Sequence, residues 1–306
     1  MTALEPERTL PDDVRTARIG ALEIAYEAYG DPADPAVLLV MGLGTQMIAW
    51  PDALVADLVA AGRYVVRFDN RDCGLSTHLD GVTAPDPLKV LARRAKAPYS
   101  IEDMAQDALG LMDAIGLETA DVVGASMGGY IAQALALLAP ERVRSLTLIM
   151  TSTGGRLVGR PRAQVLPQLL RRRPVKDREE AVQRVLDTYR LIGSKGFPRD
   201  EDYLRDLAGR SLDRGYQPAG YLRQLAACLT QPDRSAKLRL LTIPTLVVHG
   251  LHDPLVGPSG GLALARTIRN ARFVGYAGMG HDLPRAIWDD LARDVLAVSA
   301  KGLEKA

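Results

Sequence analysis

The sequence predicts an α/β fold in which a mostly parallel, eight-stranded sheet carries helices on both faces. Short continuous apolar runs, such as residues 36–41 and 64–68, alternate with segments of helical periodicity. A short apolar run of this kind is typical of a strand that is buried on both faces. Strands that alternate with helices along the chain indicate a parallel sheet covered by those helices.

The first half of the chain supplies the signals for four strands and two helices. Residues 16–29 alternate around Gly20 and are expected to form a hairpin of two strands. A turn cluster at 30–35 precedes the strand at 36–41, and a helix over about residues 50–61 stops at Gly62. After the strand at 64–68, Ser100 and Asp103 have the spacing of a capping box that starts a helix ending at Gly116.

The second half completes the sheet after an interruption. A strand leads directly into Ser126, a long apolar helical pattern runs from there to Pro140, and another strand fits residues 143–150. Residues 152–240 contain no strand-like run; Arg-rich helical segments broken by prolines take its place. Strands resume at 244–249 and near 271–274, and an amphipathic helix fits about 287–300. We therefore expect a core of residues 1–151 and 241–306 with a helical cap, residues 152–240, inserted in it.

Composition and charge narrow the functional classes. The 306 residues are 47% hydrophobic and 25% charged, which is ordinary for a globular protein. A net charge of +1 gives no general attraction to nucleic acids or anionic membranes. The N-terminus lacks the pattern of a secretory signal, and no apolar run reaches the roughly 18 residues of a membrane span. Cys73 and Cys228 suggest neither a disulfide framework nor a metal site. These features favour a cytoplasmic enzyme without cofactor, metal, nucleic-acid or membrane partner; they are silent on oligomeric state.

One short stretch carries the clearest chemistry. Residues 121–130 contain Gly-x-Ser-x-Gly at Gly124, Ser126 and Gly128, between an expected strand and an expected helix. A sharp strand-to-helix turn presents such a serine at the edge of the sheet, and the glycines permit close backbone approach. A serine hydroxyl becomes a useful nucleophile when a base takes its proton. The alternative, a purely structural turn, is less consistent with this context.

The base and its carboxylate partner are sought in loops at strand ends. Of the four histidines, His281 lies in a glycine-flanked loop before the last helix and is our candidate base. His249 is expected to be a buried strand end, His252 to precede the acid, and His78 to lie on the surface. Asp253, which follows the strand at 244–249, is the candidate that orients His281; Asp282 is adjacent to the histidine and poorly placed for this role.

The remaining site residues concern the oxyanion and the pocket. Backbone N–H groups of Met127 and Leu43 are the expected donors to a tetrahedral oxyanion. Met41, Met47 and Met279 lie near the strand-end loops and are tentative pocket residues, with ordinary core filling as the alternative. The basic run 171–173 could attract anionic substrates or simply be a solvated helix face.

Taken together, these segments resemble a serine-type α/β-hydrolase of the esterase branch. The resemblance includes the loop 41–44, the loop 69–76, the serine turn, the turn at Asp253 and the loop at His281. Residues 31–50 and the serine turn resemble polyketide methyl esterases of the aclacinomycin methylesterase type. The resemblance implies the α/β-hydrolase fold and a Ser126–His281–Asp253 triad with Leu43 and Met127 as oxyanion donors. It implies a carboxylic ester hydrolase that acts through an acyl-enzyme intermediate on small to medium apolar esters or methyl esters.

The sequence departs from the family pattern at two places, and several other activities of such a fold remain as alternatives. Met41-Gly42 replaces the commoner His-Gly, and the loop 69–72 departs from Asp-x-Arg-Gly; we interpret that loop as a structural tie between strand ends. Ser-based relatives also include carbon–carbon bond hydrolases, lactonases and cofactor-free perhydrolases, and some hydrolase folds act as ligand receptors.

Overall fold

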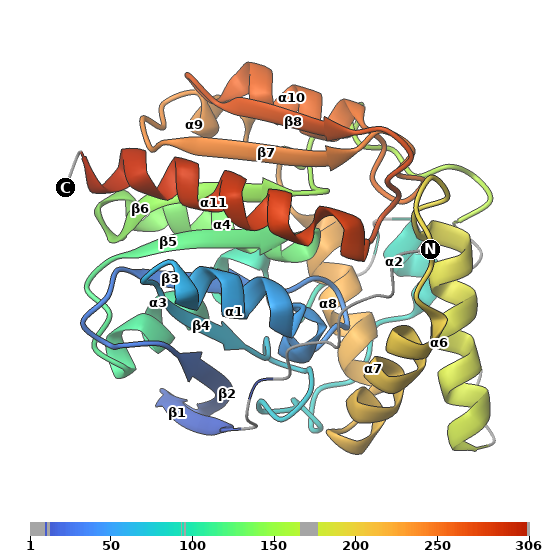
Figure 1. Cartoon of the computed structure of the whole chain (residues 1–306). Helices are drawn as coiled ribbons and strands as arrows, with labels where there is room; N and C mark the ends of the chain where they lie inside the picture. The colour runs from blue at the N-terminus through green and yellow to red at the C-terminus, as the bar shows by residue number, and fades with distance from the viewer. Residues whose placement is uncertain (1–9, 11–12, 93, 95, 166–176, 305–306) are drawn as a thin grey trace.

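Eight strands form one mixed sheet in the computed structural model of the chain (Figure 1). The structure describes residue 10 and residues 13–92, 94, 96–165 and 177–304. The order of the strands across the sheet is β1-β2-β4-β3-β5-β6-β7-β8. Along the chain, the strands are β1 Arg15–Ile19, β2 Leu22–Tyr29, β3 Ala36–Val40, β4 Tyr64–Phe68, β5 Ala120–Ala125, β6 Val143–Ile149, β7 Thr245–Gly250 and β8 Arg272–Tyr276. The expected mostly parallel, eight-stranded sheet flanked by helices is confirmed.

Only the two pairs that include β2 depart from the parallel arrangement. The pairs β1–β2 and β2–β4 are antiparallel, and every other neighbouring pair is parallel. All residues of β3, β4, β5 and β7 are buried, which agrees with their continuous apolar runs. The parallel strands therefore end at one common edge of the sheet.

Helices cover both faces of the sheet. One core contains residues of α3 (Ile101–Ala114), α4 (Met127–Leu138) and α10 (Ser259–Thr267). The other core contains residues of α1 (Asp52–Ala60) and α11 (Trp288–Leu303). Each helix thus buries an apolar face against the strands.

Several helix bounds follow from local chemistry. The capping box at Ser100 and Asp103 is present in both directions at the start of α3. The helix expected from Trp50 begins later, because a 3₁₀ turn, η1 (Met47–Ala49), and Pro51 precede α1. Two described helices were not expected, α10 and the short α2 (Pro87–Leu91).

Four described helices separate β6 from β7 in the sequence. They are α6 (Arg178–Ile192), α7 (Glu201–Asp213), α8 (Pro218–Thr230) and the short α9 (Ser235–Leu238). Figure 1 shows α6, α7 and α8, hereafter the inserted helices, beside the edge at which the parallel strands end. The proposed basic run at 171–173 lies outside the described residues, and the division into core and cap stays a prediction.

The loop 69–72 ties the inserted helices to the sheet through charged groups. Arg214 of the α7 end donates to Asp69 at 2.7 Å, and Arg223 of α8 donates to both oxygens of Asp72 at 2.6 and 2.8 Å. Arg71 pairs with Asp107 of α3. Because these aspartates are buried, the loop acts as the structural tie that we expected from its ionic residues.

Candidate active site

Ser126 lies in a strained turn between β5 and α4. Its backbone has φ 55° and ψ −115°, a left-handed conformation that costs a non-glycine residue free energy. The Ser126 N–H donates to the carbonyl of Ile149 at 2.9 Å, which fixes the turn to the neighbouring strand β6. The side chain therefore stands at the edge of the sheet, at the start of a helix.

The glycines around Ser126 are required by backbone contacts. A Cβ atom on Gly128 would lie 2.0 Å from the Val40 carbonyl oxygen, and one on Gly124 would lie 2.3 Å from the Gly128 carbonyl oxygen. Both distances are far below van der Waals contact, so a larger residue would push α4 away from β3 and β5. The Gly-x-Ser-x-Gly pattern thus has a packing reason at each glycine.

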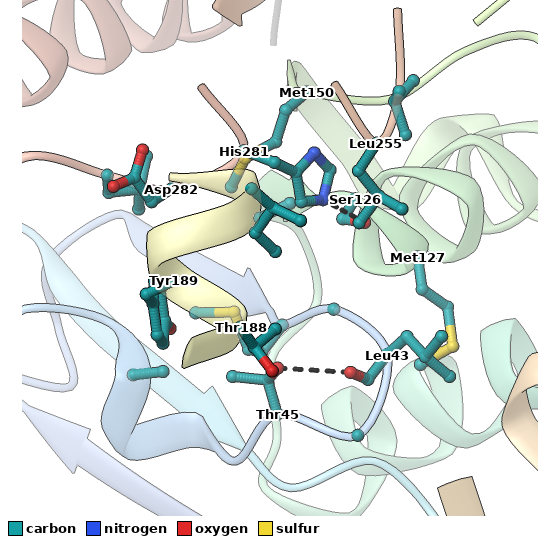
Figure 2. Close-up of a pocket in the computed structure, with 18 of the residues that line it drawn as sticks. Leu43, Thr45, Ser126, Met127, Met150, Thr188, Tyr189, Leu255, His281 and Asp282 are labelled. Atoms are coloured by element: carbon teal, nitrogen blue, oxygen red, sulfur yellow. Dashed lines mark hydrogen bonds between the residues drawn. The ribbon is translucent and has the colours of Figure 1, made fainter. Parts of the chain in front are cut away.

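The structure brings the side chains of Ser126, His281 and Asp253 together (Figure 2). The Nε2 atom of His281 is 2.9 Å from Ser126 Oγ, and its Nδ1 atom is 2.7 Å from Asp253 Oδ2. His281 and Asp253 are buried, whereas Ser126 is half-buried and faces a cavity. This arrangement can pass the serine proton to the imidazole while the carboxylate holds the ring.

Asp253 is held by the turn that follows β7. Its Oδ1 accepts the N–H groups of Leu255 at 2.8 Å and Val256 at 2.9 Å, which leaves Oδ2 for His281. These local bonds have the form of an Asx turn, and they fix the rotamer of the carboxylate. One carboxylate thus both closes this turn and reaches the histidine.

The other three histidines lie elsewhere. His249 is fully buried, with Nε2 2.8 Å from the Val256 carbonyl oxygen and 3.7 Å from Asp253 Oδ2. Burial lowers the pKa of His249, so its ring is neutral near pH 7. His252 accepts the Gly278 N–H, and His78 contacts the Gly74 carbonyl oxygen. None of these rings contacts Ser126 among the described residues.

Asp282 contacts a different partner from its neighbour. Its Oδ1 accepts the backbone N–H of Ser194 at 2.9 Å and the Ser194 hydroxyl at 2.5 Å. Burial raises the pKa of the Asp282 carboxyl, an effect that the Ser194 hydrogen bonds oppose. Asp282 therefore does not orient the ring of His281 through a hydrogen bond.

The expected oxyanion donors lie beside the serine. A Cβ atom on Gly42 would be 3.3 Å from the Ala125 carbonyl oxygen and 3.7 Å from Ser126 Oγ, so the loop that carries Leu43 approaches the hydroxyl closely. Met127 N–H is the first of α4, where helical amides lack partners within the helix. Within the described parts of the chain, neither the Leu43 nor the Met127 amide has a recorded hydrogen-bond partner.

A cavity of about 510 Å³ opens at Ser126 and extends under the inserted helices. Figure 2 shows Leu43, Met127, Met150, Thr188, Tyr189 and Leu255 around it. Its apolar lining comes from the sheet edge and from the inserted helices, and includes Met41, Leu43, Met127, Met150, Val185, Leu204, Leu207, Leu225 and Leu255. The cavity thus accommodates a ligand of considerable apolar bulk.

Our assignment of Met47 and Met279 to the pocket is wrong. Met41 lines the cavity, but Met47 packs fully buried against Ile48 and Leu207. Met279 packs fully buried against Ile287 and Trp288. Position in a loop near a strand end does not decide which way a side chain points, and for these two residues core filling prevails.

Two cysteines also line the cavity, Cys73 and Cys228. Burial raises the pKa of Cys73 well above its ordinary value and that of Cys228 to about 12. Both thiols are therefore protonated near pH 7 and are poor nucleophiles. Ser126 has no competitor among these groups.

No helix within the described residues is both long enough and apolar enough to cross a membrane. Among the same residues, no group of three or more His, Cys, Asp or Glu side chains could hold a metal ion.

Comparisons with known proteins find relatives along most of this chain. The chain is 33% identical over 291 residues to rhodomycin D methylesterase DauP of Streptomyces sp. strain C5, covering 89% of this chain and 93% of the relative. It is 29% identical to a 2-hydroxy-6-oxononadienedioate/2-hydroxy-6-oxononatrienedioate hydrolase of Paraburkholderia xenovorans, covering 86% and 85%. The crystal structure of a hydrolase from Pseudomonas aeruginosa PA01 superimposes with a TM-score of 0.70 at 25% identity, covering 95% and 98%.

The methylesterase relatives confirm the expected type of enzyme, a carboxylesterase. A model of the alpha/beta hydrolase fold matches residues 35–284, which is most of the chain. The resemblance inferred from the sequence motifs is confirmed by the same comparisons. The chain therefore belongs to the alpha/beta hydrolase fold family.

Proposed function

We propose that this enzyme hydrolyses carboxylic esters through an acyl-enzyme intermediate on Ser126. His281 takes the Ser126 proton as Oγ attacks the ester carbonyl, and it returns that proton to the departing alcohol. A water molecule, activated by the same ring, then attacks the acyl group, and the carboxylic acid leaves while Ser126 regains its proton. Asp253 holds the ring and stabilises the imidazolium.

One observation carries this proposal, namely the imidazole of His281 between a hydroxyl and a carboxylate. Contacts of 2.9 Å to Ser126 Oγ and 2.7 Å to Asp253 Oδ2 lie within hydrogen-bond range on both sides of the ring. Since Asp253 accepts at Nδ1, the neutral ring carries its proton there and offers a free lone pair at Nε2. That tautomer is the one that a base for Ser126 requires.

The negative charge of the tetrahedral intermediate needs donors that are already in place. We assign this role to the N–H groups of Leu43 and Met127, which flank Ser126 from the loop after β3 and from the start of α4. The N-terminus of α4 adds a favourable dipole at the same point. A donor of this kind is worth roughly 10²- to 10³-fold in turnover.

The cavity suggests the substrate class. Because its lining combines many apolar side chains with a volume of about 510 Å³, we propose esters with a bulky apolar acyl part. Relatives named as rhodomycin D methylesterases favour a methyl ester of such an acid. The inserted helices supply much of the lining, so residues 152–240 act in this proposal as a cap that sets specificity.

A second candidate is hydrolysis of a carbon–carbon bond in an oxo-dienoate, which is favoured by the similarity to the Paraburkholderia xenovorans hydrolase. It would use the same hydroxyl and imidazole, since fold and site alone do not fix the bond that is broken. An ester panel together with a 2-hydroxy-6-oxo-dienoate separates the two, because each candidate predicts a large preference for its own substrate.

The decisive test is Ser126→Ala together with active-site labelling. We expect turnover of a p-nitrophenyl ester and of bulky methyl esters to fall by roughly 10⁶-fold, because the nucleophile is removed. A fluorophosphonate should label the wild-type enzyme at Ser126 and leave the variant unlabelled. Wild-type turnover by purified Ser126→Ala would overturn the proposal, and tight ligand binding without any turnover by the wild type would indicate a receptor instead.

A further inference from the structure

The loop that carries His281 is held from two sides by different parts of the chain. On the side of the sheet, the His252 N–H donates to the Met279 carbonyl oxygen at 3.0 Å, and the Gly278 N–H donates to His252 Nδ1 at 3.0 Å. These hydrogen bonds end at residue 279, and the Gly280 carbonyl oxygen also packs closely against Gly250 of β7. The backbone of residues 280–282 is held instead by the segment 192–196 at the end of α6, which we call the α6 tail.

The α6 tail forms hydrogen bonds with each of residues 280, 281 and 282. The Gly280 N–H donates to Ser194 Oγ at 2.9 Å, and the His281 N–H donates to the Ile192 carbonyl oxygen at 2.7 Å. Asp282 Oδ1 accepts both the backbone N–H and the hydroxyl of Ser194. The Ser194 hydroxyl therefore accepts from the residue before His281 and donates to the residue after it.

Glycines allow the two segments to approach this closely. A Cβ atom on Gly280 would lie 2.5 Å from the Gly193 and Ile192 carbonyl oxygens, and one on Gly196 would lie 2.5 Å from Gly278 Cα. The Lys195 and Gly196 N–H groups also donate to the Gly278 carbonyl oxygen, at 3.2 and 3.0 Å. The backbone of His281 is thus placed by direct contact with the α6 tail, which lies more than 80 residues earlier in the sequence.

The rest of α6 lines the cavity that opens at Ser126. Thr188, Tyr189 and Ile192 of this helix belong to the lining, and Figure 2 shows Thr188 and Tyr189 below the labelled His281 and Asp282. The same helix that borders the ligand space therefore also sets the position of the base. Misplacement of a catalytic group by about 1 Å can cost on the order of 10²-fold in rate.

We propose that Ser194 and Asp282 are positioning residues that fix the backbone of His281, and with it the reach of the imidazole to Ser126. The assignment rests on the proposed function of Ser126 and His281. Neither side chain contacts the Ser126 hydroxyl or the His281 ring through a hydrogen bond among the described residues; both act through the loop. Both residues also border the cavity, so the test must separate an effect on kcat from an effect on KM.

The kinetic test compares Ser194→Ala with Ser194→Thr and Asp282→Asn in the full-length enzyme. With a p-nitrophenyl ester as substrate, Ser194→Ala should lower kcat by about 10- to 100-fold and change KM by less than about twofold. Ser194→Thr keeps a hydroxyl and should restore most of the lost kcat. Asp282→Asn keeps an acceptor for Ser194 and should lose less than Ser194→Ala does.

The matched control is Ser235→Ala at the start of α9. Like Ser194, Ser235 donates its hydroxyl to an aspartate, Asp233, but within the described part of the chain it does not hydrogen-bond the His281 loop. Its kcat should equal that of the wild type. Thermal unfolding of every variant is measured in parallel. Wild-type kcat in folded Ser194→Ala, a loss confined to KM, or no recovery in Ser194→Thr would overturn the positioning role.

A readout without turnover keeps this proposal separate from the proposed function. The proton that His281 Nδ1 shares with Asp253 should give a low-field ¹H NMR signal, which is assigned by its absence in Asp253→Ala. Ser194→Ala should shift or broaden that signal, whereas Ser235→Ala should not. An unchanged signal overturns the positioning role even in an active enzyme, and a shifted signal in a protein with no esterase activity supports it while the proposed function fails.

Discussion

The sheet edge and the inserted helices meet at the same cavity but are built by different forces. At the edge, backbone touches backbone: Gly124 and Gly128 lie where any side chain would collide with α4 or β3. The inserted helices pack on the core partly through apolar side chains, and charged side chains add further ties, such as Arg214 on Asp69 and Arg223 on Asp72. The reacting side chains thus lie at the sheet edge, and the residues to which we assign substrate specificity lie on the inserted helices.

A substitution at the sheet edge should disturb more of the fold than a substitution at the inserted helices. A collision of backbone atoms cannot be relieved by a side-chain rotation, so a change at the sheet edge should affect the whole fold. An ion pair can be broken while the helices that it joins keep their own hydrogen bonds. Losses at the inserted helices should therefore remain more local. The predictions below test that contrast.

Among variants that keep the nucleophile, the largest effect is expected at Asp253. Asp253→Asn keeps the size of the side chain and its bonds to Leu255 and Val256, but it removes the charge that holds the His281 ring. We expect kcat to fall by on the order of 10⁴-fold, because the wrong tautomer of the imidazole then faces Ser126. Steady-state kinetics with thermal unfolding is the measurement. A loss below tenfold would show that the ring is oriented by another group.

Gly128→Ala tests the backbone contacts of the sheet edge. The new methyl group would lie 2.0 Å from the Val40 carbonyl oxygen, so we expect the free energy of unfolding to fall by more than about 4 kcal/mol, or the protein not to fold. Gly81→Ala is the control, because nothing lies within 4 Å of its new methyl group. Denaturant unfolding measures both. Equal stabilities of the two variants would contradict the close-contact account of the serine turn.

Much of the rigid part could be predicted from the sequence, because its signals are local. Apolar runs mark the buried strands, and glycines around Ser126 mark a turn that only they can form. That residues 126, 253 and 281 approach one another followed from the rule that parallel strands end at one edge. Helix α10 was missed because Gly260 and Gly261 suggest a loop; they allow that helix to pack on Ser152 and His249.

The inserted helices gave few usable signals, for physical reasons. Their contacts join residues far apart in sequence, such as Ser194 with Asp282 or Arg223 with Asp72. No local periodicity encodes which face of α6 borders a cavity. Met47 and Met279 illustrate the same limit at the sheet edge, because loop position alone did not reveal that both side chains point into packed cores.

Asp72→Asn tests the ties of the inserted helices. Burial alone would raise the pKa of Asp72, but hydrogen bonds from Arg223, Leu79 N–H and Tyr99, with the charge of Arg223, lower it below its ordinary value. The variant leaves Arg223 as a buried charge without its counterion, which should cost roughly 3 kcal/mol at pH 7. Limited proteolysis should cut the inserted helices of the variant before the core.

The pH dependence gives a second check on this pair. Because the folded pKa lies below the unfolded value, the ion pair contributes its full stability above about pH 4 and loses it as the pH falls through the folded pKa. The difference in stability between wild type and Asp72→Asn should therefore shrink below pH 4. A difference that is constant down to pH 3 would show that the charge of Asp72 does not provide the stabilisation.

The smallest expected effect concerns His249, which is buried behind Asp253. Burial lowers the pKa of His249, and the charge of Asp253, whose Oδ2 is 3.7 Å from Nε2, only partly offsets this effect. The Nδ1 atom of His249 has no hydrogen-bond partner among the described residues. The unfolded state therefore binds the proton more readily, so the stability contributed by the neutral ring is complete above about pH 6.5 and is lost as the pH falls below it. His249→Gln cannot titrate, and its stability should decline less between pH 8 and 5.5 than that of the wild type. Taking the difference between the two proteins removes the contributions that they share. Parallel pH slopes would mean that His249 binds protons equally in the folded and unfolded states, and that burial does not lower its pKa.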